Sequence, residues 1–118
     1  MSKVADFERF RERMNELILG AGNRTVDRFF ALDSRAYDGG RLDEKTKEML
    51  GLVASLVLRC DDCITYHILQ CHARGVDSSE FFEIFAIAMV VGGSITIPHV
   101  RRAAEVLEEL GQFSGDEA

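Results

Sequence analysis

Apolar residues recur at steps of three and four along most of this chain, as in Val4, Phe7, Phe10 and Met14, which is the spacing of one helix face. Glycines follow most of these periodic segments and mark where they stop. The pattern predicts six helices, at residues 4–19, 25–37, 43–58, 60–74, 78–91 and 98–110. We therefore expect an all-α fold, a bundle of about six helices forming a single domain over residues 1–118.

The ends of the later helices carry recognisable signals. Asp43 is a good N-cap for the third helix, Asp77 with Glu80 forms a capping-box pattern, and Pro98 suits a first helical position. The third helix has a wide apolar arc and should be central. The fifth, 78–91, is apolar nearly all round. It is either the core helix or part of a contact between identical subunits, and both interpretations stay open.

Composition narrows the class of protein. Fourteen Lys and Arg against twenty Asp and Glu give a net charge of −6, which argues against a nucleic-acid partner. The longest apolar stretch, 84–91, is far too short to span a membrane. The N-terminus lacks a signal-peptide pattern, so a cytoplasmic location is expected. Three cysteines, an odd number, fit a reducing compartment better than a disulfide-stapled secreted domain.

The chemical signature is Cys60-Asp61-Asp62-Cys63-Ile64-Thr65-Tyr66-His67, a C-x-x-C-x-x-x-H motif at a predicted helix start. A spacing of three puts both sulfurs on one helix face, and His67 follows Cys63 on that face one turn later. Free amides at a helix N-terminus favour a thiolate, whereas Asp61 and Asp62 should raise the thiol pKa and point to water. This pattern favours a redox pair in which His67 takes the thiol proton.

Other interpretations of these residues are weaker. A metal site is one alternative. Along a helix, Cys60 and Cys71 are ~16 Å apart, too far to bind one ion, and Cys60 and His67 are ~10 Å apart, near the limit of side-chain reach. We therefore expect no metal ion or cofactor. Cys71 is interpreted as a small buried hydrophobe. His72 suits the C-terminal end of its helix, and His99 could line the site from the next helix.

Several of these segments together resemble a known family. Residues 42–48 (LDEKTKE), the C-x-x-C-x-x-x-H motif, Gly75 and the apolar helix ending at Gly92-Gly93 are similar to the alkyl hydroperoxidase D (AhpD)-like members of the carboxymuconolactone decarboxylase family. The similarity covers about residues 42–107. A Glu twelve residues before the cysteine motif, here Glu48, is typical of the peroxidase branch.

The resemblance implies a helical homo-oligomer, a trimer or a hexamer, that reduces hydroperoxides with electrons from a dithiol donor such as a lipoylated protein. It assigns the peroxide-attacking thiol to Cys63, the resolving thiol to Cys60, and the proton relay to His67 and Glu48. We expect Cys60, at the helix start, to be the more exposed of the two sulfurs and the incoming dithiol to attack the disulfide there. Without the resemblance, Glu48 would be interpreted as a solvated charge.

Asp62 departs from the family pattern, because the founding peroxidases carry a His just before the second cysteine. A proton relay that uses that imidazole is therefore incomplete here, and the chain resembles the core unit of the family without the longer N-terminal half. Two alternatives follow from the residues and the wider family. One is a carboxymuconolactone decarboxylase-like lyase, against which the cysteine pair counts. The other is a non-enzymatic oligomeric binding module whose cysteines only pack.

Overall fold

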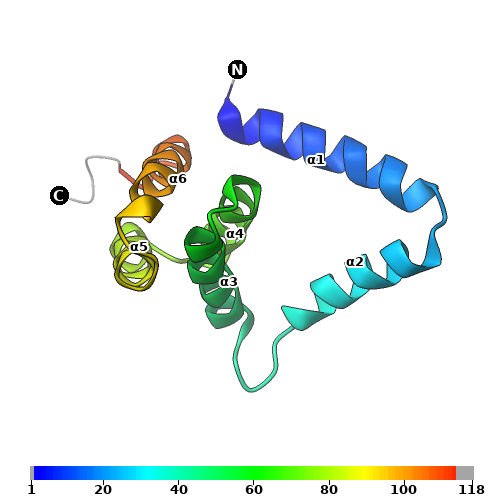
Figure 1. Cartoon of the computed structure of the whole chain (residues 1–118), viewed down its shortest axis with the longest axis horizontal. Helices are drawn as coiled ribbons and strands as arrows, with labels where there is room; N and C mark the ends of the chain where they lie inside the picture. Colours follow the sequence, from blue (N-terminus) through cyan, green and yellow to red (C-terminus); the bar gives the residue numbers. More distant parts are fainter. Residues whose placement is uncertain (1, 114–118) are drawn as a thin grey trace.

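The computed structural model describes residues 2–113 and contains six α-helices and a short 3-10 helix in that range (Figure 1). The elements are α1 (Lys3–Gly20), α2 (Arg24–Ala36), α3 (Glu44–Leu58), α4 (Asp61–Ala73), α5 (Ser78–Gly92), the 3-10 helix Ser94–Thr96 and α6 (Ile97–Glu109). The all-α fold class with six helices is thus confirmed. No helix in the described range is long and apolar enough to cross a membrane.

The core lies among α3, α4, α5 and α6. Helix α3 packs against both α4 and α5, as expected for the central helix, and α4 packs against α6. The fully buried apolar side chains come from these four helices and the α4–α5 loop, and include Leu52, Leu56, Ile64, Ile68, Cys71, Val76, Phe81, Phe85, Val106 and Leu107. Burial of these apolar side chains is the main force that holds α3 against α4.

Helix starts follow the caps seen in the sequence. Asp43 accepts a hydrogen bond from the Thr46 amide, and Asp77 with Glu80 forms a complete capping box. Pro98 falls one position later than expected, because the helix begins at Ile97, directly after the 3-10 turn that the periodicity did not predict.

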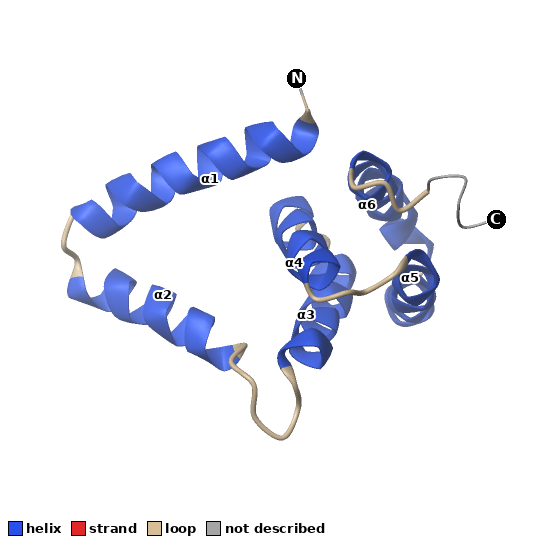
Figure 2. Ribbon diagram, turned by 180° about the vertical axis from the view of Figure 1, so that it is seen from behind, coloured by secondary structure: helices blue, strands red, loops and turns tan. Residues whose placement is uncertain are grey.

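Helices α1 and α2 form an arm that opens away from the bundle as a wide V (Figures 1 and 2). Neither helix has a fully buried residue. The free end of α1 is held at α6, where the Glu109 carboxylate accepts hydrogen bonds from the Lys3 and Val4 amides at 3.1 and 3.0 Å. At the other end, Lys47 donates to the carbonyl oxygens of Ala36 and Asp38, which fixes the α2–α3 loop.

Helix α5 has one buried and one exposed face. The sequence left open whether it is a core helix or part of a subunit contact, and its buried face belongs to the core. Phe81, Ile84, Phe85 and Ala88 are buried in the core. The opposite face exposes apolar side chains, with Val90 85% accessible. Helix α5 is therefore a core helix that also presents an apolar surface.

Candidate active site

The two cysteines of the motif meet at the start of α4. Cys60 is the N-cap residue, and its Sγ accepts a hydrogen bond from the Cys63 amide at 3.3 Å. The chain turns sharply just before it, because Arg59 adopts a left-handed conformation (φ 62°) and the Cys60 amide donates to the Ser55 carbonyl. All three cysteines are free thiols. Cys63 is exposed and Cys60 half-buried, so the expectation that Cys60 is the more accessible sulfur is wrong.

The environment of Cys63 keeps its thiol protonated. Partial burial raises the pKa of Cys63 to about 11, and the hydrogen bond with the Cys60 side chain and the charges of Asp62 and Asp33 act in the same direction. The predicted effect of Asp62 is thus present. At pH 7 only about one thiol in ten thousand is ionised. A reaction at this sulfur therefore needs a base that removes its proton.

Glu48 and His67 form a buried pair beside this thiol. The Glu48 carboxylate lies 2.8 Å from His67 Nδ1, and the two residues are only 2% and 7% exposed. They come from α3 and α4, whose packing brings together side chains nineteen positions apart in sequence. Its charged neighbours in the sequence suggest that Glu48 is a solvated surface charge, but the fold buries it. A buried carboxylate at this distance fixes the orientation of the ring.

The hydroxyl of Tyr37, a residue for which the sequence predicted no role, contacts the other nitrogen of this ring. Its hydroxyl lies 3.4 Å from His67 Nε2, with the ring centroids 5.2 Å apart. Within residues 2–113, no hydrogen bond joins His67 to Cys63, although the spacing of four suggested one. A glycine inside a helix, Gly51, was the available signal, because such a residue often marks a close approach.

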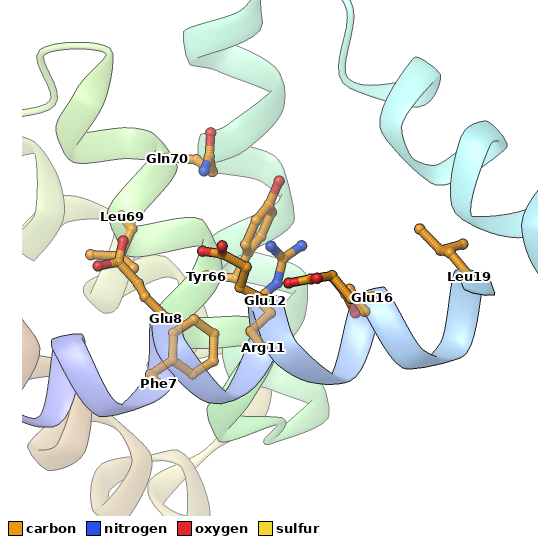
Figure 3. A pocket seen from close by; sticks show the side chains of 10 residues that line it. Phe7, Glu8, Arg11, Glu12, Glu16, Leu19, Tyr66, Leu69 and Gln70 are labelled. Atoms are coloured by element: carbon orange, nitrogen blue, oxygen red, sulfur yellow. The ribbon is translucent and has the colours of Figure 1, made fainter. Parts of the chain in front are cut away.

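An open groove of about 340 Å³ leads to Cys63 and His67. It lies between α1 and the start of α4, with an apolar wall made by Phe7, Phe10 and Met14. A larger hollow of about 560 Å³ continues along α1, where Arg11 lies over the Tyr66 ring at 4.3 Å (Figure 3). That hollow is farther from the sulfurs, so the smaller groove is the candidate substrate site.

The remaining candidate residues lie elsewhere. His99 contacts the Asp61 carboxylate at 2.7 Å, beside Arg102 of the same helix, and does not line the groove. The suggestion that His99 lines the site is thus wrong, and Asp61 is engaged by α6 instead of pointing freely to water. Cys71 is fully buried, and its burial raises the pKa of its thiol to about 12.

His72, in the last turn of α4, contacts the Gln112 side chain. Over the described part of the chain, no three His, Cys, Asp or Glu side chains gather in a way that could hold a metal ion.

The fold and the site define a small helical protein with a dithiol pair at a helix start and a buried acid–imidazole pair beside it. Residues 24–106 match the carboxymuconolactone decarboxylase family, and the chain belongs to this family. The match extends farther toward the N-terminus than the segment from residue 42 that carries the resemblance, and takes in α2 with Tyr37.

Solved structures agree with this placement. Crystal structures of TM1620 from Thermotoga maritima share 52% and 51% identity with this chain, with TM-scores of 0.88 and 0.87. They cover 94% and 95% of this chain, and 97% and 95% of the TM1620 chains. TM1620 is a carboxymuconolactone decarboxylase family protein for which a part in the antioxidative response has been suggested.

Two more distant relatives are similar over most of their length. The family member lpg0406 from Legionella pneumophila is 30% identical, with a TM-score of 0.60, over 93% of this chain and 88% of its own. An uncharacterized protein of the cox locus of Paracoccus denitrificans is 27% identical over 76% of this chain and 81% of its own length.

Proposed function

We propose that this protein is a thiol-dependent peroxidase and disulfide oxidoreductase that cycles Cys60 and Cys63 between dithiol and disulfide. The observation that carries the proposal is the position of the pair. The Cys60 sulfur accepts a hydrogen bond from the Cys63 amide at a helix start, beside a substrate-sized groove and the buried Glu48–His67 pair. The antioxidative part suggested for TM1620, which is 51% identical over nearly the whole chain, supports the same chemistry.

In the first step, the Cys63 sulfur attacks the terminal oxygen of a hydroperoxide. A sulfur–oxygen bond forms, the oxygen–oxygen bond breaks, and the thiol proton ends on the departing alkoxide, giving an alcohol and a sulfenic acid. His67 holds that proton in between, and Glu48 stabilises the imidazolium. Because the pKa of Cys63 is about 11, this base makes the attack feasible at neutral pH.

In the second step, Cys60 attacks the sulfenic acid of Cys63, which releases water and leaves a disulfide. An external dithiol, for which a lipoylated protein is our candidate, then reduces it by thiol–disulfide exchange. Since Cys63 is the more exposed residue, we place the donor's attack on Cys63, with Cys60 departing as a thiolate stabilised by the helix amides. This reverses the expectation drawn from the sequence. A reducing cytoplasm would maintain such a donor.

The groove favours an organic hydroperoxide as substrate. Phe7, Phe10 and Met14 offer apolar surface to a hydrocarbon group whose peroxide end reaches Cys63. Phe10 remains 64% exposed, so the wall is open to a bulky substrate.

The direct test is mass spectrometry after treatment with one equivalent of an organic hydroperoxide. We expect a Cys60–Cys63 disulfide to form while Cys71, buried and with a raised pKa, stays a free thiol. All three residues lie in one tryptic peptide, 60–74, so tandem fragmentation after alkylation locates the link. Protein that remains fully reduced, or that links Cys71 instead, would rule out the proposed cycle.

We further propose that the protein assembles with copies of itself through the arm. Helix α2 exposes Phe29 (67%) and Leu32 (64%) on one face, and nothing in the described chain covers them. An apolar stripe of this kind is typical of a subunit contact. The trimer or hexamer implied by the resemblance would cover it.

Replacing both Phe29 and Leu32 by Glu should therefore dissociate the assembly, because two charges would be buried in an apolar contact. Size-exclusion chromatography with light scattering measures the mass. Ser34→Glu, on the opposite face of α2, is the matched control and should leave the mass unchanged. A wild-type protein that is monomeric at micromolar concentration would refute the proposal.

A further inference from the structure

Tyr37 reaches His67 from outside the core bundle. It is the C-cap residue of α2, and among residues 31–40 it is the one side chain that is not exposed. Its hydroxyl lies 3.4 Å from His67 Nε2, and its ring tilts 43° against the imidazole. The arm, which has no fully buried residue, thus inserts one polar group into the buried acid–imidazole site.

The bundle provides a space for this contact. A Cβ atom at Gly51 of α3 would lie 2.9 Å from the Tyr37 hydroxyl and 2.7 Å from His67 Cε1, closer than real side chains approach. A glycine in a helix interior destabilises the helix relative to alanine. Its presence here is explained by the phenol and the imidazole that meet over it.

The hydrogen bonds define which nitrogen of His67 can act as a base. As a carboxylate, Glu48 accepts a hydrogen bond from Nδ1–H, which leaves the lone pair on Nε2. The Tyr37 O–H is the group in the described chain that points at this lone pair, and it donates to it. A proton can therefore enter Nε2 through the Tyr37 oxygen.

His67 links Tyr37 to the groove that holds Cys63, because its ring contacts the Tyr37 hydroxyl and lines the groove together with Cys63. Burial raises the pKa of Tyr37, and the charges of Asp33, Glu48 and Cys63 raise it further, so the phenol keeps its proton. Asp33 also raises the pKa of Cys63. Asp33 lines the same groove as Cys63 and His67, and its negative charge acts on both the thiol and the phenol.

We propose that Tyr37 is a relay residue that passes protons between His67 Nε2 and the reacting groups at Cys63, a role that rests on the peroxidase function proposed above. As Cys63 attacks, its proton moves to the Tyr37 oxygen and the phenolic proton moves to Nε2. The reverse transfer protonates the departing alkoxide, so the phenol and imidazole are unchanged after the step. Cys63–SH and ROOH have then become Cys63–SOH and ROH.

Tyr37→Phe removes the relay oxygen and leaves the ring, and two oxidants test what that oxygen does. With tert-butyl hydroperoxide the leaving group is a strongly basic alkoxide that needs a proton, whereas with peracetic acid it is acetate, which does not. Single-turnover loss of the Cys63 thiol at pH 7 gives both rates. We expect the variant to lose at least about tenfold more rate with tert-butyl hydroperoxide than with peracetic acid.

Tyr66→Phe, which removes the hydroxyl of the chain's other tyrosine, is the matched control and should keep the wild-type ratio of the two rates. Equal losses with both oxidants in Tyr37→Phe, or no loss, would overturn the relay while the peroxidase function stands. Wild-type protein that reacts with neither oxidant would instead overturn the proposed function, and the relay with it.

A second measurement does not depend on activity. The ¹⁵N signal of His67 Nε2 should move in Tyr37→Phe, because the nitrogen loses its hydrogen-bond donor. An unmoved signal would show that the phenol does not contact this nitrogen in solution and would overturn the relay.

Discussion

Replacing Cys63 by serine should abolish hydroperoxide consumption in the presence of a dithiol, with a loss of at least about a thousandfold. The hydroxyl is a far weaker nucleophile toward peroxide oxygen than sulfur, and it cannot form the sulfenic acid that Cys60 attacks. The site should keep its shape, because Cys63 is exposed and serine is close to it in size. Peroxide-coupled oxidation of the dithiol is the measurement.

The other two cysteines provide the matched variants. Cys60→Ser should consume one equivalent of peroxide and then stop, with a sulfenic acid on Cys63 that dimedone traps. Cys71→Ala should continue to turn over, because this buried residue is not part of the cycle. Full turnover by Cys63→Ser would contradict the proposed function. Failure of all three native thiols to react would favour a non-enzymatic helical module.

Replacing Glu48 by glutamine should slow peroxide reduction about a hundredfold and change the free energy of unfolding little. The glutamine oxygen can still accept the hydrogen bond from His67 Nδ1, so the ring keeps its position. The negative charge that stabilises the imidazolium is lost, and general acid–base catalysis at this magnitude is typical. The measurements are the rate constant for Cys63 oxidation and a denaturant unfolding curve for each variant.

Glu48→Ala should add a loss of stability of ~1–3 kcal/mol, because it leaves the buried Nδ1–H of His67 without a partner. Glu44→Gln is the matched control, since this residue lies one turn earlier on α3 and its side chain is 53% exposed in a surface ion pair with Arg74. Glu44→Gln should keep its rate. A Glu48→Gln variant as fast as wild type would mean that the carboxylate only holds the ring in place.

The local features of this protein could be predicted because their causes are local. Helix periodicity, the caps at Asp43 and Asp77, and the cysteine spacing all depend on residues within one or two turns of one another. In the structure Pro98 is the second residue of its helix instead of the first, and a 3-10 turn precedes that helix. Such differences arise because the ends of helices depend on small differences in backbone hydrogen bonding.

The site needed contacts between elements that the sequence alone does not specify. Glu48 lies among charged neighbours, and only the packing of α3 against α4 removes it from water and aligns it with His67. Tyr37 gives no signal of its own, because a phenol at the end of an amphipathic helix is common. The relative exposure of Cys60 and Cys63 was also predicted in the wrong order, since accessibility is set by neighbouring helices.

The sequence by itself determined the helices, the central place of α3, and the presence of a thiol pair at the start of α4, because short-range spacing encodes each of them. The tertiary structure alone decided which groups surround that pair. It buries the Glu48 carboxylate against one nitrogen of His67, brings Tyr37 to the other, and gives Cys63 a raised pKa. Burial and proton affinity depend on atoms from distant parts of the chain, and these meet only when the helices pack.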